Sequence, residues 1–387
     1  MASPTTHAKL SASGAMKWIN CPPMLWMEEG LPDTTSPYAA EGTLAHSLVE
    51  AKLARETDKI TDAEYAKKLA HIKQSQFYNQ SMEDYTDDHV ALVLEDFNGT
   101  PDADIYLEKR VNFSDWATGG FGTSDTIIAS DGQLQIWDLK YGKGVKVNAD
   151  HNFQLMLYAL GAYAFYDVLY GFESVKMTIS QPRIGNLSQF EMSMDDLLKW
   201  GEEVVKPAAD DAMNGRGEWD FEDPHTWRFY KAAGFCRHLA EKNLEIRKYE
   251  FKQANTLKPD EIADILDQKA DIERWLKAVE YYAMSQVRDG KLVVPGYKLV
   301  EGRSNRKITD PVAAETVLRK HGFNKRDITE TKLLSLTALE KVTGKDKFTQ
   351  LLGDLILRPT GKPTLVTNDD KRPAMNSVED AQNDFDN

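Results

Sequence analysis

One short hairpin constrains the fold of this chain more than any other feature. Two β-prone runs, 126–129 and 134–137, flank Asp131-Gly132, a dipeptide that strongly favours a two-residue turn. That turn places Asp125 directly opposite Asp138. Residues opposed on antiparallel strands are about 5 Å apart, so like charges repel there. The sequence therefore predicts two facing carboxylates that need either a cation between them or a proton on one of them.

Lys140 offers a positive charge beside this pair. It follows Asp138 by two residues, so both side chains project from the same face of the strand. Two carboxylates and an ammonium at one end of a hairpin suit phosphodiester hydrolysis with Mg²⁺ or Mn²⁺. Such an ion lowers the pKa of bound water, and the ammonium orients that water or neutralises developing charge. Because Asp-x-Lys alone is more typical of an exposed hairpin with solvated charges, the pairing register carries the prediction.

Four further polar residues extend the candidate site. Gln154 and Tyr158 are four residues apart in an apolar helical segment, so they share one helix face. His46 lies near the start of an amphipathic helical segment, and Glu108 lies in an alternating strand over 105–111. Each also has a plain structural interpretation: a capping or packed histidine, a surface amide, a core tyrosine, and a glutamate paired across the sheet.

In this order, the motifs resemble those of the RecB-type branch of the PD-(D/E)XK nuclease superfamily. That branch has Gly-Thr-x-x-His on an N-terminal helix, then a strand glutamate, Gly-x-x-Asp, Asp-x-Lys and Gln-x-x-x-Tyr. The corresponding positions of this chain are 42–46, Glu108, 122–125, 138–140 and 154–158. The sequence around the last two motifs is similar to that of a phage and prophage subgroup of uncharacterised nucleases. This likeness extends almost to the C-terminus.

The resemblance implies roles for individual residues. The expected metal ligands are His46, Asp125, Asp138 and the backbone carbonyl of Leu139, with Mg²⁺ or Mn²⁺ as the ion. The expected catalytic residues are Asp125, Asp138, Lys140 and Glu108. Gln154 and Tyr158 are expected to contact the nucleic acid or to position the lysine.

Cysteine usage departs from the pattern of this branch. Many relatives hold an iron–sulfur cluster with one N-terminal cysteine and a C-terminal Cys-x-x-Cys-x5-Cys set. Cys21 and Cys236 stand at the first and last of those places, but Trp227 and Tyr230 stand at the middle two. A four-iron cluster requires four thiolates as a rule, so we predict no cluster. We expect the two aromatic rings to fill that volume by packing, with both cysteines close together as thiols.

Net charge and composition limit the function further. A net charge of −14 gives weak long-range attraction for DNA, so phosphate contacts must come from local basic patches. Lys143 and Lys146 follow the predicted strand in a glycine-spaced loop, and these two with Arg183 are candidate DNA contacts. No apolar run is long enough to cross a bilayer, and the first residues lack a signal-peptide core. A cytoplasmic location is expected, in the bacterial host if the chain is phage-encoded.

The fold class expected is α/β, with a small mixed β-sheet flanked by helices. By resemblance this is a restriction-endonuclease-like core with a C-terminal helical extension. Residues 1–250 are expected to form the nuclease core with its N-terminal helices, one of them over 61–98. Residues 251–358 are expected to form the helical extension and a small C-terminal region, and 359–387 a disordered acidic tail.

The function expected is that of a metal-dependent DNA nuclease, an exonuclease that processes DNA ends in phage recombination or replication. Its expected partners are DNA and a phage recombination or replication protein, with no membrane, and its oligomeric state stays open. DNA over RNA, and exonuclease over endonuclease, come from the resemblance. Two alternatives remain: a nucleic-acid-binding module without catalysis, and a phage structural or assembly protein with a structural metal.

Overall fold

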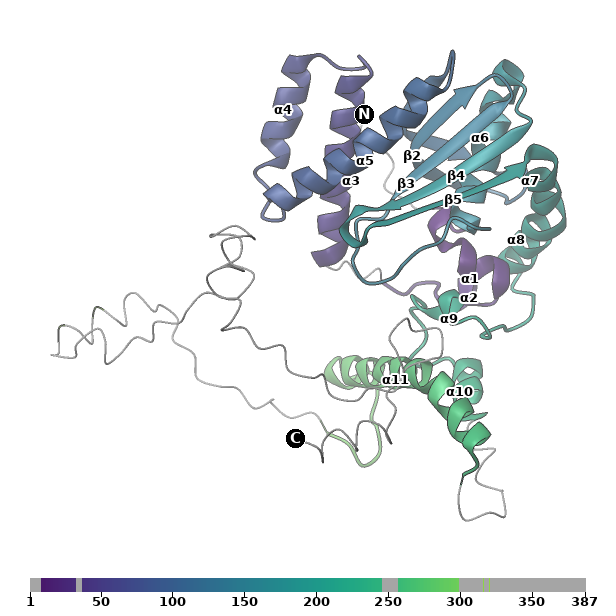
Figure 1. Cartoon of the computed structure of the whole chain (residues 1–387). Helices are drawn as coiled ribbons and strands as arrows, with labels where there is room; N and C mark the ends of the chain where they lie inside the picture. Colours follow the sequence, from purple (N-terminus) through teal and green to yellow (C-terminus); the bar gives the residue numbers. More distant parts are fainter. Residues whose placement is uncertain (1–7, 33–36, 246–256, 299–315, 317–319, 321–387) are drawn as a thin grey trace, which may run out of the picture. The chain divides into compact units, whose positions relative to one another are not determined.

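The computed structural model describes residues 8–32, 37–245, 257–298, 316 and 320 (Figure 1). The chain divides into two units, Met1–Val300 and Glu301–Asn387, and the following helices and strands belong to the first. The helices are α1 (Ala15–Asn20), α2 (Met24–Met27), α3 (Pro37–Glu56), α4 (Asp62–Ile72), α5 (Gln80–Gly99), α6 (Phe153–Tyr170), α7 (Met194–Trp200), α8 (Lys206–Met213), α9 (Pro224–Trp227), α10 (Arg237–Leu244) and α11 (Pro259–Arg288). The strands are β1 (Asp104–Asn112), β2 (Phe121–Ser130), β3 (Gln133–Leu139), β4 (Ser174–Gln181) and β5 (Asn186–Ser193).

The five strands form one mixed sheet in the order β1-β2-β3-β4-β5. Only the central pair, β3 and β4, is parallel; the other three pairs are antiparallel. A parallel pair needs a crossover connection, and α6 supplies it. The side chain of Asn152 caps the start of α6 by accepting hydrogen bonds from the backbone N–H groups of Gln154 and Leu155, and Gly171 ends it at φ +56°. The predicted α/β class with a small mixed sheet is confirmed.

The predicted hairpin register is confirmed by the β2–β3 ladder. Ser130 pairs with Gln133 and Ile127 with Ile136, so Asp131 and Gly132 form the two-residue turn. Gly132 has φ +73°, a conformation that glycine adopts without strain. The ladder ends at Thr126 and Trp137. One residue further along each strand, the same register brings Asp125 opposite Asp138.

Helices cover both faces of the sheet, and each face has its own apolar core (Figure 1). Ile128 and Trp137 face α3 and α5. Their sequence neighbours Ile127 and Ile136 face α6. Because β3 is covered on both sides, nearly every residue in it is buried. The end of this strand is therefore held rigidly between two helical layers.

Glu108 interrupts the regular alternation of β1. Ile105 packs in the core with α3 and α5, whereas Val111, six residues on, packs in the core with α6. Residues six apart in a regular strand share a face, so the alternation reverses once between them. Glu108 has φ +44°, in the left-handed region that residues other than glycine rarely adopt. We assign the reversal to this residue.

The expectation of one helix over 61–98 was wrong. Thr61 begins α4 with a capping box to Glu64, and Asn79 begins a separate helix, α5, by accepting a hydrogen bond from the backbone N–H of Met82. The predicted boundary near residue 250 lies within 246–256, outside the described residues, as does the predicted acidic tail. No helix in the described part of the chain is both long and apolar enough to span a bilayer.

Candidate functional site

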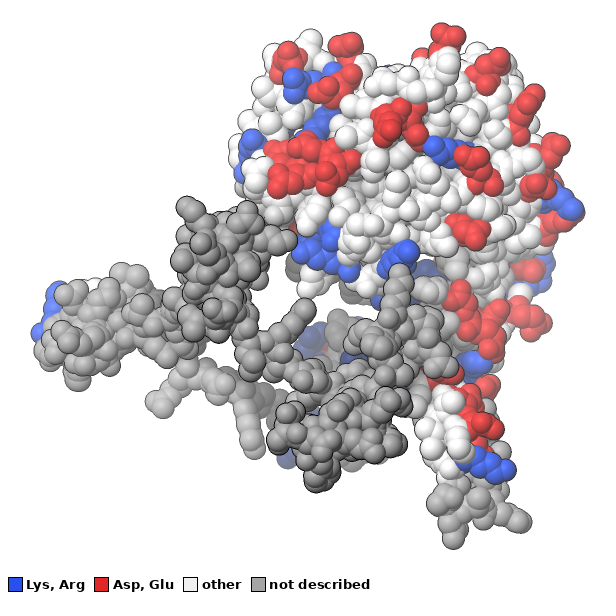
Figure 2. All heavy atoms as spheres, viewed as in Figure 1, with Lys and Arg blue, Asp and Glu red and all other residues white. Residues whose placement is uncertain are grey.

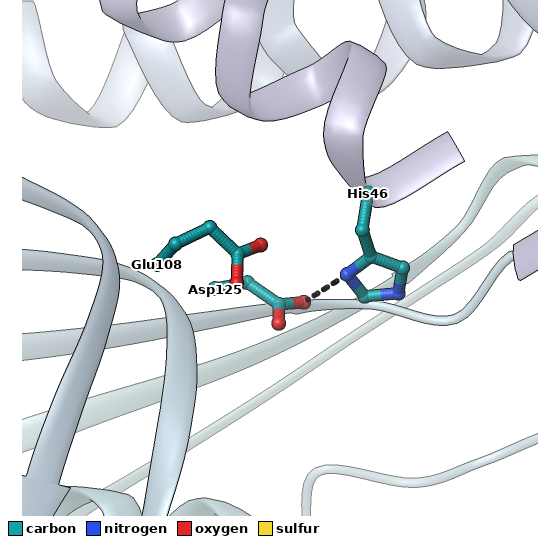
Figure 3. A group of neighbouring side chains, drawn as sticks. All are labelled: His46, Glu108 and Asp125. Atoms are coloured by element: carbon teal, nitrogen blue, oxygen red, sulfur yellow. Dashed lines mark ion pairs between the residues drawn. The ribbon is translucent and has the colours of Figure 1, made fainter. Parts of the chain in front are cut away.

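Three predicted site residues from three different elements meet at one end of the hairpin (Figure 3). His46 reaches down from α3, Asp125 lies on β2, and Glu108 lies beside it on β1. One potential ligand atom of each lies within 4.8 Å of the others. The Nδ1 atom of His46 is 3.2 Å from Oδ2 of Asp125. The unusual backbone of Glu108 therefore occurs where its carboxylate joins this group.

A second set of connected side-chain contacts starts at the end of β3. Lys140 Nζ donates to Oδ1 of Asp138 at 3.0 Å and lies 2.9 Å from its Oδ2. It also donates to Oε1 of Gln154 at 2.9 Å. The amide nitrogen of Gln154 donates in turn to the hydroxyl of Tyr158 at 3.0 Å. The structure thus brings together the Asp-x-Lys and Gln-x-x-x-Tyr motifs: Gln154 contacts Lys140, and Tyr158 contacts Gln154.

The two opposed carboxylates are each compensated separately. Asp125 pairs with His46 and accepts the backbone N–H of Leu139 at 2.8 Å. Asp138, only 2% exposed, pairs with Lys140. Each of the facing aspartates is therefore paired with a basic side chain, and a divalent ion between them stays a prediction. A ligand role for the carbonyl of Leu139 stays a prediction.

Burial and mutual charge shift the pKa values of these groups. Burial raises the pKa of Asp138, and it raises that of Glu108 to about 7 with help from the charge of Asp125. Burial also disfavours the charged form of Asp125, but the charge and the hydrogen bond of His46 outweigh it, so the pKa of Asp125 is lowered. Burial disfavours the charged forms of His46 and Lys140, yet the neighbouring carboxylates prevail; the pKa of His46 rises to about 9 and that of Lys140 rises as well.

These groups fit a divalent cation. The ligand atoms of His46, Glu108 and Asp125 converge; the two carboxylates suit Mg²⁺ or Mn²⁺, and the imidazole suits transition-metal ions. Oδ2 of Asp138 is buried and receives no hydrogen bond of good geometry. The three residues whose ligand atoms converge differ from the predicted metal ligands. Glu108 is one of them, whereas Asp138 is not and pairs with Lys140 instead. Ion type and ligand set therefore stay predictions.

Gly122 explains why a glycine precedes Asp125 by three residues. A Cβ atom on Gly122 would lie 2.7 Å from Cε1 of the Tyr158 ring, closer than real contacts allow. The glycine lets Tyr158 reach Gln154. The other motif glycine, Gly42 on α3, has nothing within 4 Å of such an atom, so the structure shows no packing need for it.

The three candidate DNA contacts fall into two classes. Lys143 and Lys146 are exposed on the loop after β3. Among described residues, neither forms an ion pair. Arg183 is only 14% exposed; it donates to Glu41 at 2.9 Å and its guanidinium lies over the ring of Tyr141. The ion pair between Arg183 and Glu41 links the segment after β4 to the first part of α3. The structure thus accounts for Arg183 without DNA, whereas Lys143 and Lys146 remain candidates.

The cysteines and their aromatic neighbours share one small core. This core includes Cys21, Trp227, Tyr230, Cys236 and, from α11, Trp275. Both thiols are free and buried. The predicted packing of the aromatic pair between the two cysteines' segments is confirmed. The absence of an iron–sulfur cluster stays a prediction.

Sequence reasoning missed His89 on α5. Its ring is fully buried, contacts Trp137 edge to face, and has no hydrogen-bond partner on either nitrogen among the described residues. The charges of Asp125 and His46 both act on it. A single histidine in a polar helix gives no local signal of such a place, because the burial comes from packing against β3.

The fold and the site together define an α/β protein with a histidine–carboxylate cluster at the end of a β-hairpin. The chain belongs to the family described as a protein of unknown function, DUF2800, which matches residues 7–373. Among solved structures, it is similar to one titled "Crystal structure of SSO0001", at 15% identity. The match covers 62% of this chain and 89% of that one, with a TM-score of 0.27, too low to carry an argument.

Proposed function

We propose that this chain is a divalent-metal-dependent deoxyribonuclease of the RecB-type PD-(D/E)XK branch. One observation carries the proposal: residues from five separate sequence motifs lie in one connected site. They are His46, Glu108, Asp125, the Asp138–Lys140 pair, and Gln154 with Tyr158. A hairpin with merely solvated charges has no reason to bury Asp138 or to gather these groups. The choice of DNA, and of an exonuclease that processes ends in phage recombination or replication, rests on the resemblance.

The bound ion would activate water and polarise the phosphoryl group. His46, Glu108 and Asp125 would hold it, with Asp138 beside them. Gln154 fixes the position of Lys140 through a 2.9 Å hydrogen bond. The side chain of Lys140 is 28% exposed, so it can meet a substrate phosphate while still paired with Asp138.

Lys140 acts as a cation in this proposal and not as a base. Burial alone would favour the neutral amine, but Asp138 and Asp125 raise its pKa above the ordinary value. It therefore keeps its proton at neutral pH. A fixed ammonium stabilises negative charge on the phosphoryl oxygens as the transition state forms.

The test is cleavage of end-labelled single- and double-stranded DNA by the purified full chain, with Mn²⁺, Mg²⁺ or EDTA. We expect cleavage with either metal and none with EDTA. Asp138→Asn and Lys140→Gln are each expected to lower the rate by about 100-fold or more. Lys199→Gln, an exposed change on α7, serves as the control. A melting curve for each variant separates lost chemistry from lost folding.

Two outcomes would count against the enzyme. Full activity of a folded Asp138→Asn variant would show that the site is misplaced or that the chain only binds nucleic acid. A melting temperature raised by Ca²⁺, without cleavage under Mg²⁺ or Mn²⁺, would favour a structural metal. As part of the same proposal, the chain works in the bacterial host cytoplasm, with a phage recombination or replication protein as its partner.

A further inference from the structure

A small hollow opens beside the candidate site, between α3, α4 and the edge strand β1. Its volume is about 330 Å³, and its wall includes Glu50, Lys59, Lys68 and Lys109. Lys68 is paired with Glu50 at 2.9 Å. Lys59 and Lys109 form no ion pair among the described residues. The wall of the hollow thus includes two lysines without an ion-pair partner in the described part of the structure, on a chain whose net charge is −14. On the face drawn in Figure 2, acidic side chains cover more of the surface than basic ones do.

Two structural links join the hollow to the metal-binding group. Leu107 and Lys109, which line it, are the immediate neighbours of Glu108. Glu50 follows His46 by four residues on α3, one helical turn and about 6 Å further along the same face. Its charge acts on Glu108. The hollow therefore adjoins the group of residues that would hold the metal.

The reversal at Glu108 places an aromatic ring next to these lysines. Leu107 packs in the core with α3 and α5, whereas Lys109, which also lines the hollow, has its Nζ 5.6 Å from the ring centre of Phe165 on α6. Phe165 is 69% exposed, so one face of its ring is open to a ligand. A lysine pair beside an exposed aromatic ring is the combination that binds single strands, through phosphates and stacked bases.

The size of the hollow decides between ligands. Small-molecule sites measure roughly 300–1,000 Å³. At the lower end of that range, this one accommodates a phosphate with part of its sugar and not a duplex. We infer that one DNA strand passes from the metal site over the edge of β1, with a phosphate between Lys59 and Lys109 and a base on Phe165. This inference rests on the proposed nuclease function and adds the path of the strand.

The experiment measures binding of a fluorescent oligothymidylate, about 20 nucleotides long, to the full chain by anisotropy, in Ca²⁺ and over a range of salt. The double variant Lys59→Gln, Lys109→Gln is expected to bind about tenfold more weakly at low salt. The slope of log affinity against log salt should fall by about 0.7, because the two lysines share one phosphate and each single-strand phosphate contact contributes about 0.7. Phe165→Ala is expected to weaken binding by at least about fivefold.

Exposed positions elsewhere supply matched controls. Lys199→Gln removes a lysine charge on α7, which follows the opposite edge strand β5, and Val168→Ala trims a 97% exposed side chain one turn from Phe165. Both should bind like the parent. With Mn²⁺ and saturating DNA, both control variants should also cleave at the parent rate, because neither residue lies in the candidate site or in the hollow.

The outcomes separate this inference from the function it rests on. If the parent binds and cleaves DNA but the lysine and phenylalanine variants match their controls, the path over β1 is wrong and the nuclease stands. If the parent neither binds nor cleaves DNA, both fail. A lower cleavage rate at saturation, with unchanged affinity, would also overturn the path, because it would assign these side chains to the chemical step.

Discussion

The buried imidazole of His89 makes the stability of this protein sensitive to mild acid. The side chain is fully buried next to Trp137, with ring centres 6.0 Å apart, and neither nitrogen has a hydrogen-bond partner in the described part of the chain. Burial lowers its pKa from 6.5 to about 4, although the charge of Asp125 opposes the shift. The folded protein therefore holds a neutral ring that the unfolded chain protonates below about pH 6.5.

The sign and size of the effect follow from linkage. Because the unfolded chain binds the extra proton, the contribution of neutral His89 is complete above pH 6.5 and is lost as the pH falls towards 4. With the pKa values 6.5 unfolded and about 4 folded, the free energy of unfolding falls by about 2 kcal/mol between pH 7.5 and pH 5. The limit below pH 4 is about 3 kcal/mol.

His89→Leu isolates this effect, because it removes the proton site and replaces two unpaired nitrogens with apolar atoms. We expect the variant to be about as stable as the parent at pH 7.5 and about 2 kcal/mol more stable at pH 5. The measurement is urea unfolding followed by tryptophan fluorescence at pH 7.5, 6 and 5, with EDTA present so that no metal enters the site. His71→Leu, on the exposed surface of α4, is the control.

A change in packing shifts the stability at both pH values equally, so it does not imitate the expected result. The reasoning fails if the stability difference between His89→Leu and the parent is the same at pH 7.5 and pH 5. It also fails if the control variant shows the same pH-dependent gain.

Three other predictions each depend on the surroundings of one or two residues. Gly122→Ala should destabilise the protein by about 1–3 kcal/mol through its clash, whereas Gly42→Ala should be neutral or stabilise α3 by up to about 1 kcal/mol, as thermal melts of the pair will show. Burial raises the pKa of Cys21 to about 11, so its thiol should resist a disulfide reagent at pH 8 until the protein is unfolded; reaction at full rate in the native state would contradict this. Arg183→Gln should lower the unfolding free energy by about 1–3 kcal/mol yet leave the salt dependence of DNA binding unchanged; a smaller salt slope would return Arg183 to the DNA contacts.

The register of the hairpin was predictable from the sequence because a local turn motif determines it. The Asp131-Gly132 turn fixes the register of β2 and β3, and register alone decides which side chains face each other. Strand β5 has no such signal. It is an edge strand with its outer face exposed, and its inward apolar residues are only Phe190 and Met192.

Other features depend on partners far away in the sequence. The ion pair of Arg183 joins residues 142 positions apart, and no local sequence pattern near either residue predicts it. The left-handed backbone of Glu108 reflects how β1 is shared between two helical layers, which no residue of β1 encodes alone. Sequence motifs identified the residues of the site; tertiary packing decided that Glu108 joins His46 and Asp125.

Pairing with two basic side chains explains how the facing aspartates coexist. Asp125 forms an ion pair with His46, whose pKa of about 9 keeps the ring protonated at neutral pH. Asp138 forms an ion pair with the ammonium of Lys140. Burial raises the pKa of Glu108 to about 7, which disfavours its charged form at neutral pH. Three carboxylates therefore face two basic side chains, and the raised pKa values of Glu108 and Asp138 lower the negative charge that remains. A divalent ion bound at Nδ1 of His46 must replace the proton on that ring. Metal binding and protonation of His46 therefore compete, and the affinity for the metal falls as the pH falls.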